Sequence, residues 1–114
     1  MKIKLLKSKI HRAVVTDTCL DYEGSISIDR TLLHQSKIMP YEKVHVLNVT
    51  NGNRLETYAI PAKTDGEICV NGAAAHLVNK NDIVIIVSYI QMTLKEAESF
   101  HPTVIYPNEL NEVK

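Results

Sequence analysis

Residues 43–60, KVHVLNVTNGNRLETYAI, predict a β-hairpin. Polar and apolar residues alternate along 43–49, and a period of two is typical of a strand with one buried face. Asn51-Gly52 is a dipeptide strongly favoured in two-residue hairpin turns, because both central positions need a positive φ. Residues 54–60 alternate again and are expected to form the return strand. The centre of the chain is therefore expected to be antiparallel β-sheet.

Short strand patterns and turn signals continue on both sides of this hairpin. Further strands are expected at 3–7, 13–20, 26–28, 67–71, 83–87 and 103–106. Short helices are expected at 30–37, 72–77 and 92–100, with Asp29 and Thr93 as N-caps. The polar tail from Pro107 onward is expected to fray. Many short strands with only a few short helices predict a mostly β barrel.

Composition restricts the class of protein. The 114 residues fit one domain, and the 13 Lys and Arg residues balance the 13 Asp and Glu residues. A neutral chain is a poor nucleic-acid binder, because such proteins carry a basic excess. Cys19 and Cys69 have no zinc spacing and are expected to be reduced, buried thiols of a cytoplasmic protein. No stretch has the length of a membrane span.

Gly24-Ser25 is a candidate reactive site. Glycine allows backbone conformations closed to other residues, so the Ser25 hydroxyl could reach back to the Gly24 carbonyl carbon and turn the amide into an ester. Elimination would then cut the chain and leave a dehydroalanine, which hydrolyses to a pyruvoyl group. The alternative is a solvated turn, since Gly-Ser is a common turn dipeptide.

Three other groups of residues could bind an anion. Arg54 and Tyr58 share a strand face, where arginine can grip a carboxylate and tyrosine can donate a proton; the alternative is solvation and packing. The small residues at 71–76, NGAAAH, leave backbone N–H groups uncovered, or simply pack tightly on a sheet. Lys9 and His11 lie in a basic cluster that could instead be a solvated strand end. The five histidines show no metal-ligand spacing.

Taken together, five motifs resemble the pyruvoyl-dependent aspartate 1-decarboxylases. They are SKIHR (8–12), YEGS (22–25), NVTNG (48–52), TYAI (57–60) and VNGAAAH (70–76), with NDIVII (81–86) following. The resemblance implies a double-psi β-barrel assembled as a homotetramer with active sites between subunits. It also implies a proenzyme (zymogen) that cleaves itself into residues 1–24, the β chain, and 25–114, the α chain. The implied reaction is L-aspartate to β-alanine and CO2, a step of pantothenate and coenzyme A biosynthesis.

The resemblance also implies roles for single residues. Ser25 would become the pyruvoyl group, which forms a Schiff base with the substrate amine and accepts electrons without PLP or a metal ion. Tyr58 would be the proton donor. Self-processing would involve Gly24, Ser25, Thr57 and Asn71. Substrate binding would involve Lys9, His11, Arg54, Thr57, Gly72, Ala73 and Ala74.

Some features depart from this pattern. Leu47 stands where many relatives have tryptophan, which predicts a different pocket wall. A period of two places Thr57 and Tyr58 on opposite faces, so a bulge or a subunit boundary is expected there. Two other hypotheses remain open at this point. One is a non-catalytic barrel, such as a swapped-hairpin DNA-binding regulator; the other is a proenzyme-like relative that never matures.

Overall fold

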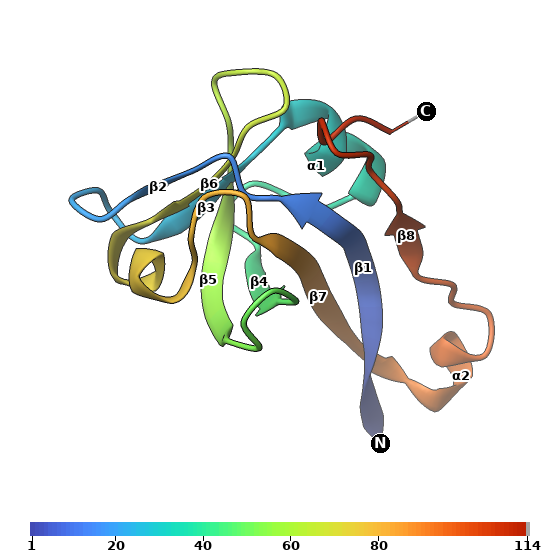
Figure 1. The fold of residues 1–114 in the computed structure, drawn as a ribbon. Helices are drawn as coiled ribbons and strands as arrows, with labels where there is room; N and C mark the ends of the chain where they lie inside the picture. The colour runs from blue at the N-terminus through green and yellow to red at the C-terminus, as the bar shows by residue number, and fades with distance from the viewer. Residues whose placement is uncertain (114) are drawn as a thin grey trace.

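The computed structural model describes residues 1–113, which form one mixed eight-stranded sheet with short helices around it (Figure 1). Along the sheet the strands lie in the order β2-β6-β3-β5-β4-β7-β1-β8. In chain order the elements are β1 (Lys2–Val14), β2 (Asp17–Cys19), β3 (Ser25–Ile28), α1 (Arg30–Ser36), β4 (Lys43–Asn48), β5 (Arg54–Pro61), β6 (Ile68–Asn71), the 3-10 helix η1 (Gly72–Leu77), β7 (Ile83–Thr93), α2 (Leu94–Ala97) and β8 (Thr103–Ile105).

Parallel and antiparallel pairs occur in the same sheet. The pairs β1–β8, β2–β6 and β3–β5 are parallel, and the other pairs are antiparallel. Parallel neighbours need crossover connections, so the chain does not follow a simple meander. The sheet is not closed, and its arrangement is consistent with a double-psi β-barrel. The prediction of a mostly β chain with a few short helices is confirmed.

The predicted central hairpin is confirmed. β4 and β5 pair in one unbroken antiparallel register from Lys43–Tyr58 to Leu47–Arg54. Val44 and Val46 point into the core and are 1% and 0% exposed. Gly52 has the expected left-handed φ of +82°, but Asn51 is not among the residues with a positive φ. The predicted two-residue turn is wrong, because residues 49–53 connect the two strands and the Gly52 N–H donates to the Asn48 carbonyl at 2.8 Å.

The predicted first helix and its cap are also confirmed. α1 begins after Asp29, whose Oδ1 accepts a hydrogen bond of 2.9 Å from the Leu32 backbone N–H. The other Asp29 oxygen accepts one of 2.7 Å from the Gly66 N–H, so this carboxylate also ties the 65–66 turn to the helix. The helix ends at Ser36, one residue before the predicted end, because Lys37 adopts a left-handed φ of 63°.

Strand β1 differs from the prediction. Instead of strands at 3–7 and 13–20, one strand runs through the polar stretch 8–12 and pairs with β7, with register shifts between Leu6 and Ser8 and between Ile10 and Ala13. The buried Ser8 hydroxyl is satisfied because it donates to the Ser36 carbonyl at 2.6 Å. After β1 the chain changes partner, since Thr16 N–H donates to the Ile68 carbonyl and β2 pairs with β6. That change of partner breaks the predicted strand 13–20.

The boundaries of β7 and α2 were also predicted incorrectly. The expected strand 83–87 continues to Thr93, because residues up to that point pair with β1 as far as Lys2. The expected helix 92–100 is therefore reduced to the short α2, although the predicted cap is present. Thr93 accepts from the Glu96 backbone, and the Glu96 carboxylate accepts from the Thr93 backbone. These hydrogen bonds hold the pKa of Glu96 below its usual value, against a small opposing effect of burial.

The core holds β3 between its two neighbours. Six of the largest fully buried side chains come from five different elements: Ile10, Ile26, Ile28, Leu32, Ile68 and Ile86. Each such side chain contributes roughly 1.5–3 kcal/mol on burial. Two of these isoleucines lie on β3, so the strand that begins at Ser25 is firmly anchored along its length.

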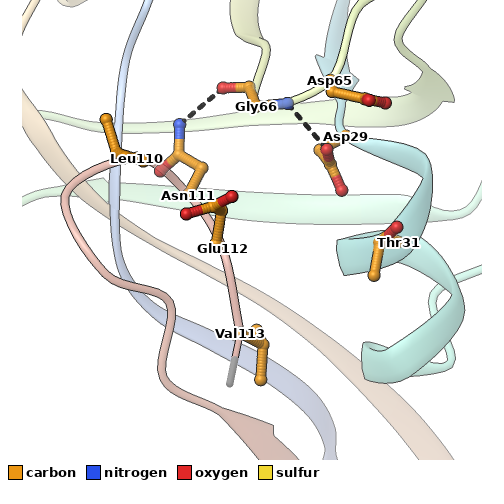
Figure 2. Close-up of a pocket in the computed structure, with 8 residues that line it drawn as sticks. All are labelled: Asp29, Thr31, Asp65, Gly66, Leu110, Asn111, Glu112 and Val113. Atoms are coloured by element: carbon orange, nitrogen blue, oxygen red, sulfur yellow. Dashed lines mark hydrogen bonds between the residues drawn. The ribbon is translucent and has the colours of Figure 1, made fainter.

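The C-terminal tail is docked, which corrects the prediction that it frays. Asn111 is 2% exposed, and its Oδ1 accepts a hydrogen bond of 2.7 Å from the Val14 N–H. Its Nδ2 donates to the carbonyls of Val14 and Gly66, both at 2.8 Å. Figure 2 shows Asn111 and Asp29 reaching Gly66 from opposite sides. Nothing in the local composition distinguishes this asparagine from a solvated one.

We expect Asn111→Ala to lower the free energy of unfolding by about 2–3 kcal/mol, because buried backbone groups of Val14 and Gly66 lose their partners. Urea unfolding measures the change. Asn79→Ala is the control, since Asn79 is exposed and its loss should shift the value by less than about 0.5 kcal/mol. Equal stability of the two variants would contradict a structural role for the docked tail.

Candidate active site

The Gly24–Ser25 peptide lies at a boundary between solvent and core. Gly24 is exposed, whereas Ser25, the first residue of β3, is 1% exposed. The Ser25 hydroxyl donates to the Glu23 carbonyl at 3.3 Å, so it points back along the chain toward the preceding residues. A Cβ built on Gly24 would meet no atom within 4 Å, and Gly24 is not among the glycines with a positive φ, so this conformation does not need the backbone freedom that was expected of glycine at position 24.

Strand β6 supplies the partner of the Ser25 hydroxyl. In the antiparallel register Ser25 lies opposite Asn71, and Asn71 Nδ2 donates to Ser25 Oγ at 3.0 Å. The same Nδ2 lies 3.1 Å from Ser27 Oγ. The predicted neighbourhood of Asn71 and the Gly24–Ser25 segment is therefore present in the structure.

Gly72 packs closely against the backbone of Gly24, on the other side of the Gly24–Ser25 junction. Its φ is +74°, and a Cβ at this position would lie 2.7 Å from Gly24 Cα and 2.8 Å from Gly24 N. Real Cβ atoms essentially never come so close to backbone atoms. Two independent features therefore require glycine at position 72: its left-handed backbone conformation and the close approach of the Gly24 backbone.

Strand β5 lies on the opposite side of β3 from β6. The two strands are parallel, with Ile26 opposite Ala59, so Tyr58 lies one residue before that pair. Thr57 is half-buried on the same face as the buried Leu55 and Ala59, whereas Tyr58 points to the other face. The pairing with β4 is unbroken here, so the expected bulge between Thr57 and Tyr58 does not occur.

The Tyr58 ring lies beside a second aromatic ring. Tyr41 and Tyr58 have ring centroids 6.2 Å apart with an interplanar angle of 32°. Tyr41 itself has a left-handed φ of 71°, and its N–H donates to the Ala59 carbonyl at 2.7 Å. The turn before β4 therefore holds an aromatic ring against the proposed proton donor.

Arg54 lies at the far end of β5 in a pocket of about 540 Å³ that it shares with Leu47 and Glu56. Across the β4–β5 pair, Glu56 is engaged by His45 Nε2 at 3.1 Å and by Lys43 Nζ at 3.4 Å. No ion pair within residues 1–113 involves Arg54. Its guanidinium is thus available to an anion, in a pocket whose wall carries Leu47.

Lys9 and His11 lie on β1, and the sheet order places β5, β4 and β7 between β1 and β3. His11 packs edge-on against Tyr106, with ring centroids 5.7 Å apart. Burial lowers the pKa of His11, and the charges of Lys9 and Arg12 lower it further. His11 Nδ1 is buried without a hydrogen-bond partner within residues 1–113.

One chain therefore gathers only part of the predicted site. Gly24, Ser25, Asn71 and Gly72 come together, with β5 alongside. No hydrogen bond in the described part of the chain joins Lys9, His11 or Arg54 to this group.

Of the small residues after Gly72, Ala73 is exposed and Ala74 packs against the core. The pocket of Figure 2 lies elsewhere, between α1 and the tail, and contains none of the predicted site residues.

Sequence reasoning missed two members of the group around Ser25. Ser27 lies opposite Cys69 in the β3–β6 register, and both side chains contact Asn71. A period of two in each strand predicts that Ser25 and Ser27 share a face, as do Cys69 and Asn71, but no local pattern shows that these two faces meet. Both cysteines are free, as expected; Cys69 is buried, but Cys19 is exposed, which corrects the prediction of two buried thiols.

These features define a small mixed β protein in which a buried serine directly follows an exposed, closely approached glycine. The family model described as aspartate decarboxylase matches residues 1–114. An aspartate 1-decarboxylase of Caulobacter vibrioides is 55% identical over 115 residues, covering 100% of this chain and 98% of the relative. The Campylobacter fetus enzyme of that name is 50% identical over 113 residues, covering 99% and 98%. The corresponding protein of Clostridium botulinum is 50% identical over 115 residues, covering 100% and 91%.

The chain belongs to the aspartate decarboxylase family. The predicted resemblance and the prediction that the chain is an enzyme are both confirmed. Within residues 1–113 no helix has the length and apolar character needed to cross a membrane. The same residues contain no group of three or more His, Cys, Asp or Glu side chains placed to hold a metal ion.

Proposed function

We propose that this chain is a self-processing decarboxylase that converts L-aspartate to β-alanine and CO2. The observation that carries the proposal is the Gly24–Ser25 junction, where a buried hydroxyl is held by Asn71 and Gly72 approaches the backbone to be cut. Membership of the family supports the substrate, because the matched relatives are named aspartate 1-decarboxylases. The proposal includes the pathway role in pantothenate biosynthesis and a cytoplasmic location.

The first step is an N-to-O acyl shift. Ser25 Oγ bonds to the Gly24 carbonyl carbon, the Gly24–Ser25 C–N bond breaks, and the hydroxyl proton passes to the released amine. Asn71 Nδ2, 3.0 Å from Oγ, orients the nucleophile, while the exposed position of Gly24 lets the peptide tilt. Thr57, on the inner face of the neighbouring strand β5, is the proposed donor to the oxyanion on the Gly24 carbonyl.

Elimination completes the cleavage. The Ser25 Cα proton passes to solvent, and the Ser25 Cβ–Oγ bond breaks so that both oxygens stay on Gly24 as its carboxylate. The resulting dehydroalanine takes up one water molecule and loses ammonia to give the ketone. The ketone so formed supplies an electrophile for the substrate amine and an electron sink for the pair released with CO2. The residues fit this group, because the small cradle of Gly24 and Gly72 would be filled by any added Cβ on Gly72.

The cationic residues are proposed to bind the substrate carboxylates. Arg54 has no ion-pair partner within residues 1–113, and arginine binds carboxylates through two parallel hydrogen bonds. Lys9, His11 and the backbone N–H groups of Gly72, Ala73 and Ala74 complete the proposed binding set. Since a single chain keeps β1 and β3 apart, we place the full site between neighbouring subunits of a homotetramer.

The test combines mass and activity on one sample. Purified protein is followed by intact mass spectrometry and a denaturing gel, and CO2 release from aspartate is measured in parallel. We expect two fragments, residues 1–24 and 25–114, a carbonyl on the larger one that borohydride reduces, and aspartate-dependent CO2. A chain that keeps its full mass after prolonged incubation, with no reducible carbonyl, would refute the proposal and favour a relative that never matures.

Tyr58→Phe separates catalysis from processing. We expect normal cleavage but a kcat lower by about 100- to 10,000-fold, because the proton that Cα receives after CO2 leaves would lack its donor. The control is Tyr41→Phe, which keeps the ring beside Tyr58 and should change kcat by less than about twofold. If both variants turned over aspartate equally fast, Tyr58 would not be the proton donor.

A further inference from the structure

A buried group of four small polar side chains lies on one face of the β3–β6 pair. Ser25 faces Asn71 and Ser27 faces Cys69 in the antiparallel register. Their exposures are 1%, 3%, 8% and 8% for Ser25, Asn71, Ser27 and Cys69. Three hydrogen bonds connect them, and all three involve the Asn71 side-chain amide.

The Asn71 side-chain amide has a donor end and an acceptor end, and its orientation decides which hydrogen bonds the Ser25 hydroxyl makes. Asn71 Oδ1 accepts from Cys69 Sγ at 3.3 Å, so Nδ2 faces the two serine hydroxyls. In this orientation Ser25 Oγ receives a hydrogen bond, and its own proton goes to the Glu23 carbonyl. The reversed amide would present an acceptor to both serines and would take the Ser25 proton itself, turning the hydroxyl away from Glu23.

We propose that Cys69 is a positioning residue for self-processing: its thiol proton selects the orientation of the Asn71 amide that directs Ser25 Oγ at Gly24. The inference rests on the proposed self-cleavage of the Gly24–Ser25 bond. Cys69 touches neither reacting atom and acts only through Asn71. The thiol proton donates to Oδ1 in the observed orientation, whereas toward a reversed amide the side chain would offer Nδ2 only its weakly accepting sulfur; an apolar side chain offers neither.

The surroundings of Cys69 keep it able to donate. Burial, together with the nearby charges of Asp17 and Glu67, raises the pKa of Cys69 from 9.0 to about 11. The thiol therefore keeps its proton throughout the physiological range. A thiolate would instead repel Asn71 Oδ1 and favour the reversed amide.

Three variants distinguish a hydrogen-bonding role of the Cys69 thiol from a role in packing alone. Cys69→Ser keeps a donor, Cys69→Val keeps apolar volume without a donor, and Cys19→Ala controls for removal of the exposed cysteine. The half-time of conversion to two fragments is measured by denaturing gel, and thermal stability is measured alongside. We expect Cys69→Ser and Cys19→Ala to cleave within about twofold of the parent. We expect Cys69→Val to cleave about 5- to 10-fold more slowly, the loss associated with one hydrogen bond.

The outcomes separate this inference from the proposed function. If the parent never cleaves, the proposed function itself fails. If the parent cleaves and Cys69→Val keeps the parental rate, or cleaves faster than Cys69→Ser, the thiol proton has no positioning role and the inference is overturned. Once cleaved, all variants should show the parental kcat for aspartate, because Cys69 acts on processing and not on the decarboxylation step.

Discussion

Ser25→Ala is expected to stay a single chain of full mass and to release no CO2 from aspartate. Alanine has no oxygen to attack the Gly24 carbonyl, so neither the ester nor the ketone can form. The methyl side chain fits the buried position, and the fold should persist, although Asn71 Nδ2 loses one acceptor. Intact mass, circular dichroism and CO2 release on the same preparation measure the three consequences.

The matched variant is Ser27→Ala. Ser27 lies on the same strand and the same face, and its hydroxyl also contacts Asn71, but it is not adjacent to Gly24. It should therefore still yield two fragments, starting from the same residue as in the parent. Detection of the 25–114 fragment in the Ser25→Ala preparation would show that cleavage does not depend on this hydroxyl.

Gly72→Ala should also slow maturation, through the backbone rather than through the nucleophile. The added Cβ would lie 2.7 Å from Gly24 Cα, so the 22–24 segment must move away from Asn71 and the start of β3. We expect cleavage at least tenfold slower than in the parent. A left-handed alanine costs a further 1–2 kcal/mol or so in the free energy of unfolding.

Gly52→Ala separates these two effects. Gly52 has a similar φ of +82°, but a Cβ there would meet no atom within 4 Å. The free energy of unfolding of Gly52→Ala should fall by about the amount expected for a left-handed alanine. The variant should still cleave at the parental rate. If Gly52→Ala and Gly72→Ala slowed cleavage equally, strain would explain the loss, and the approach to Gly24 would carry no functional meaning.

Local patterns predicted the elements whose formation depends on neighbours in the sequence. The Asp29 cap of α1 and the Thr93–Glu96 capping box form as expected, because cap preferences act over two to four residues. The two strands of the 43–60 hairpin also pair as expected, although a longer connection replaces the predicted two-residue turn. Predictions of strand length failed at β1 and β7. There the strands extend as far as a distant partner pairs with them, and no local signal contains that partner.

The candidate site shows the same difference between features that local sequence determines and features that depend on distant partners. Gly24-Ser25 and the run from Asn71 were recognisable as motifs, and the family they indicate is confirmed. The involvement of Cys69 and Ser27 was not recognisable, because it depends on which face of β3 meets which face of β6. The docking of Asn111 was missed for a related reason, since its partners Val14 and Gly66 are far away in sequence.

The sequence by itself determined the family, the Gly24-Ser25 motif and the caps of α1 and α2, since these depend on residue chemistry and short-range backbone preference. The tertiary structure alone decided the register that sets Asn71 against Ser25, the contact of Gly72 with Gly24, and the strands that separate Lys9 from both. The physical reason is that a one-residue change of register exchanges the two faces of a strand, and only packing of the whole core selects between them.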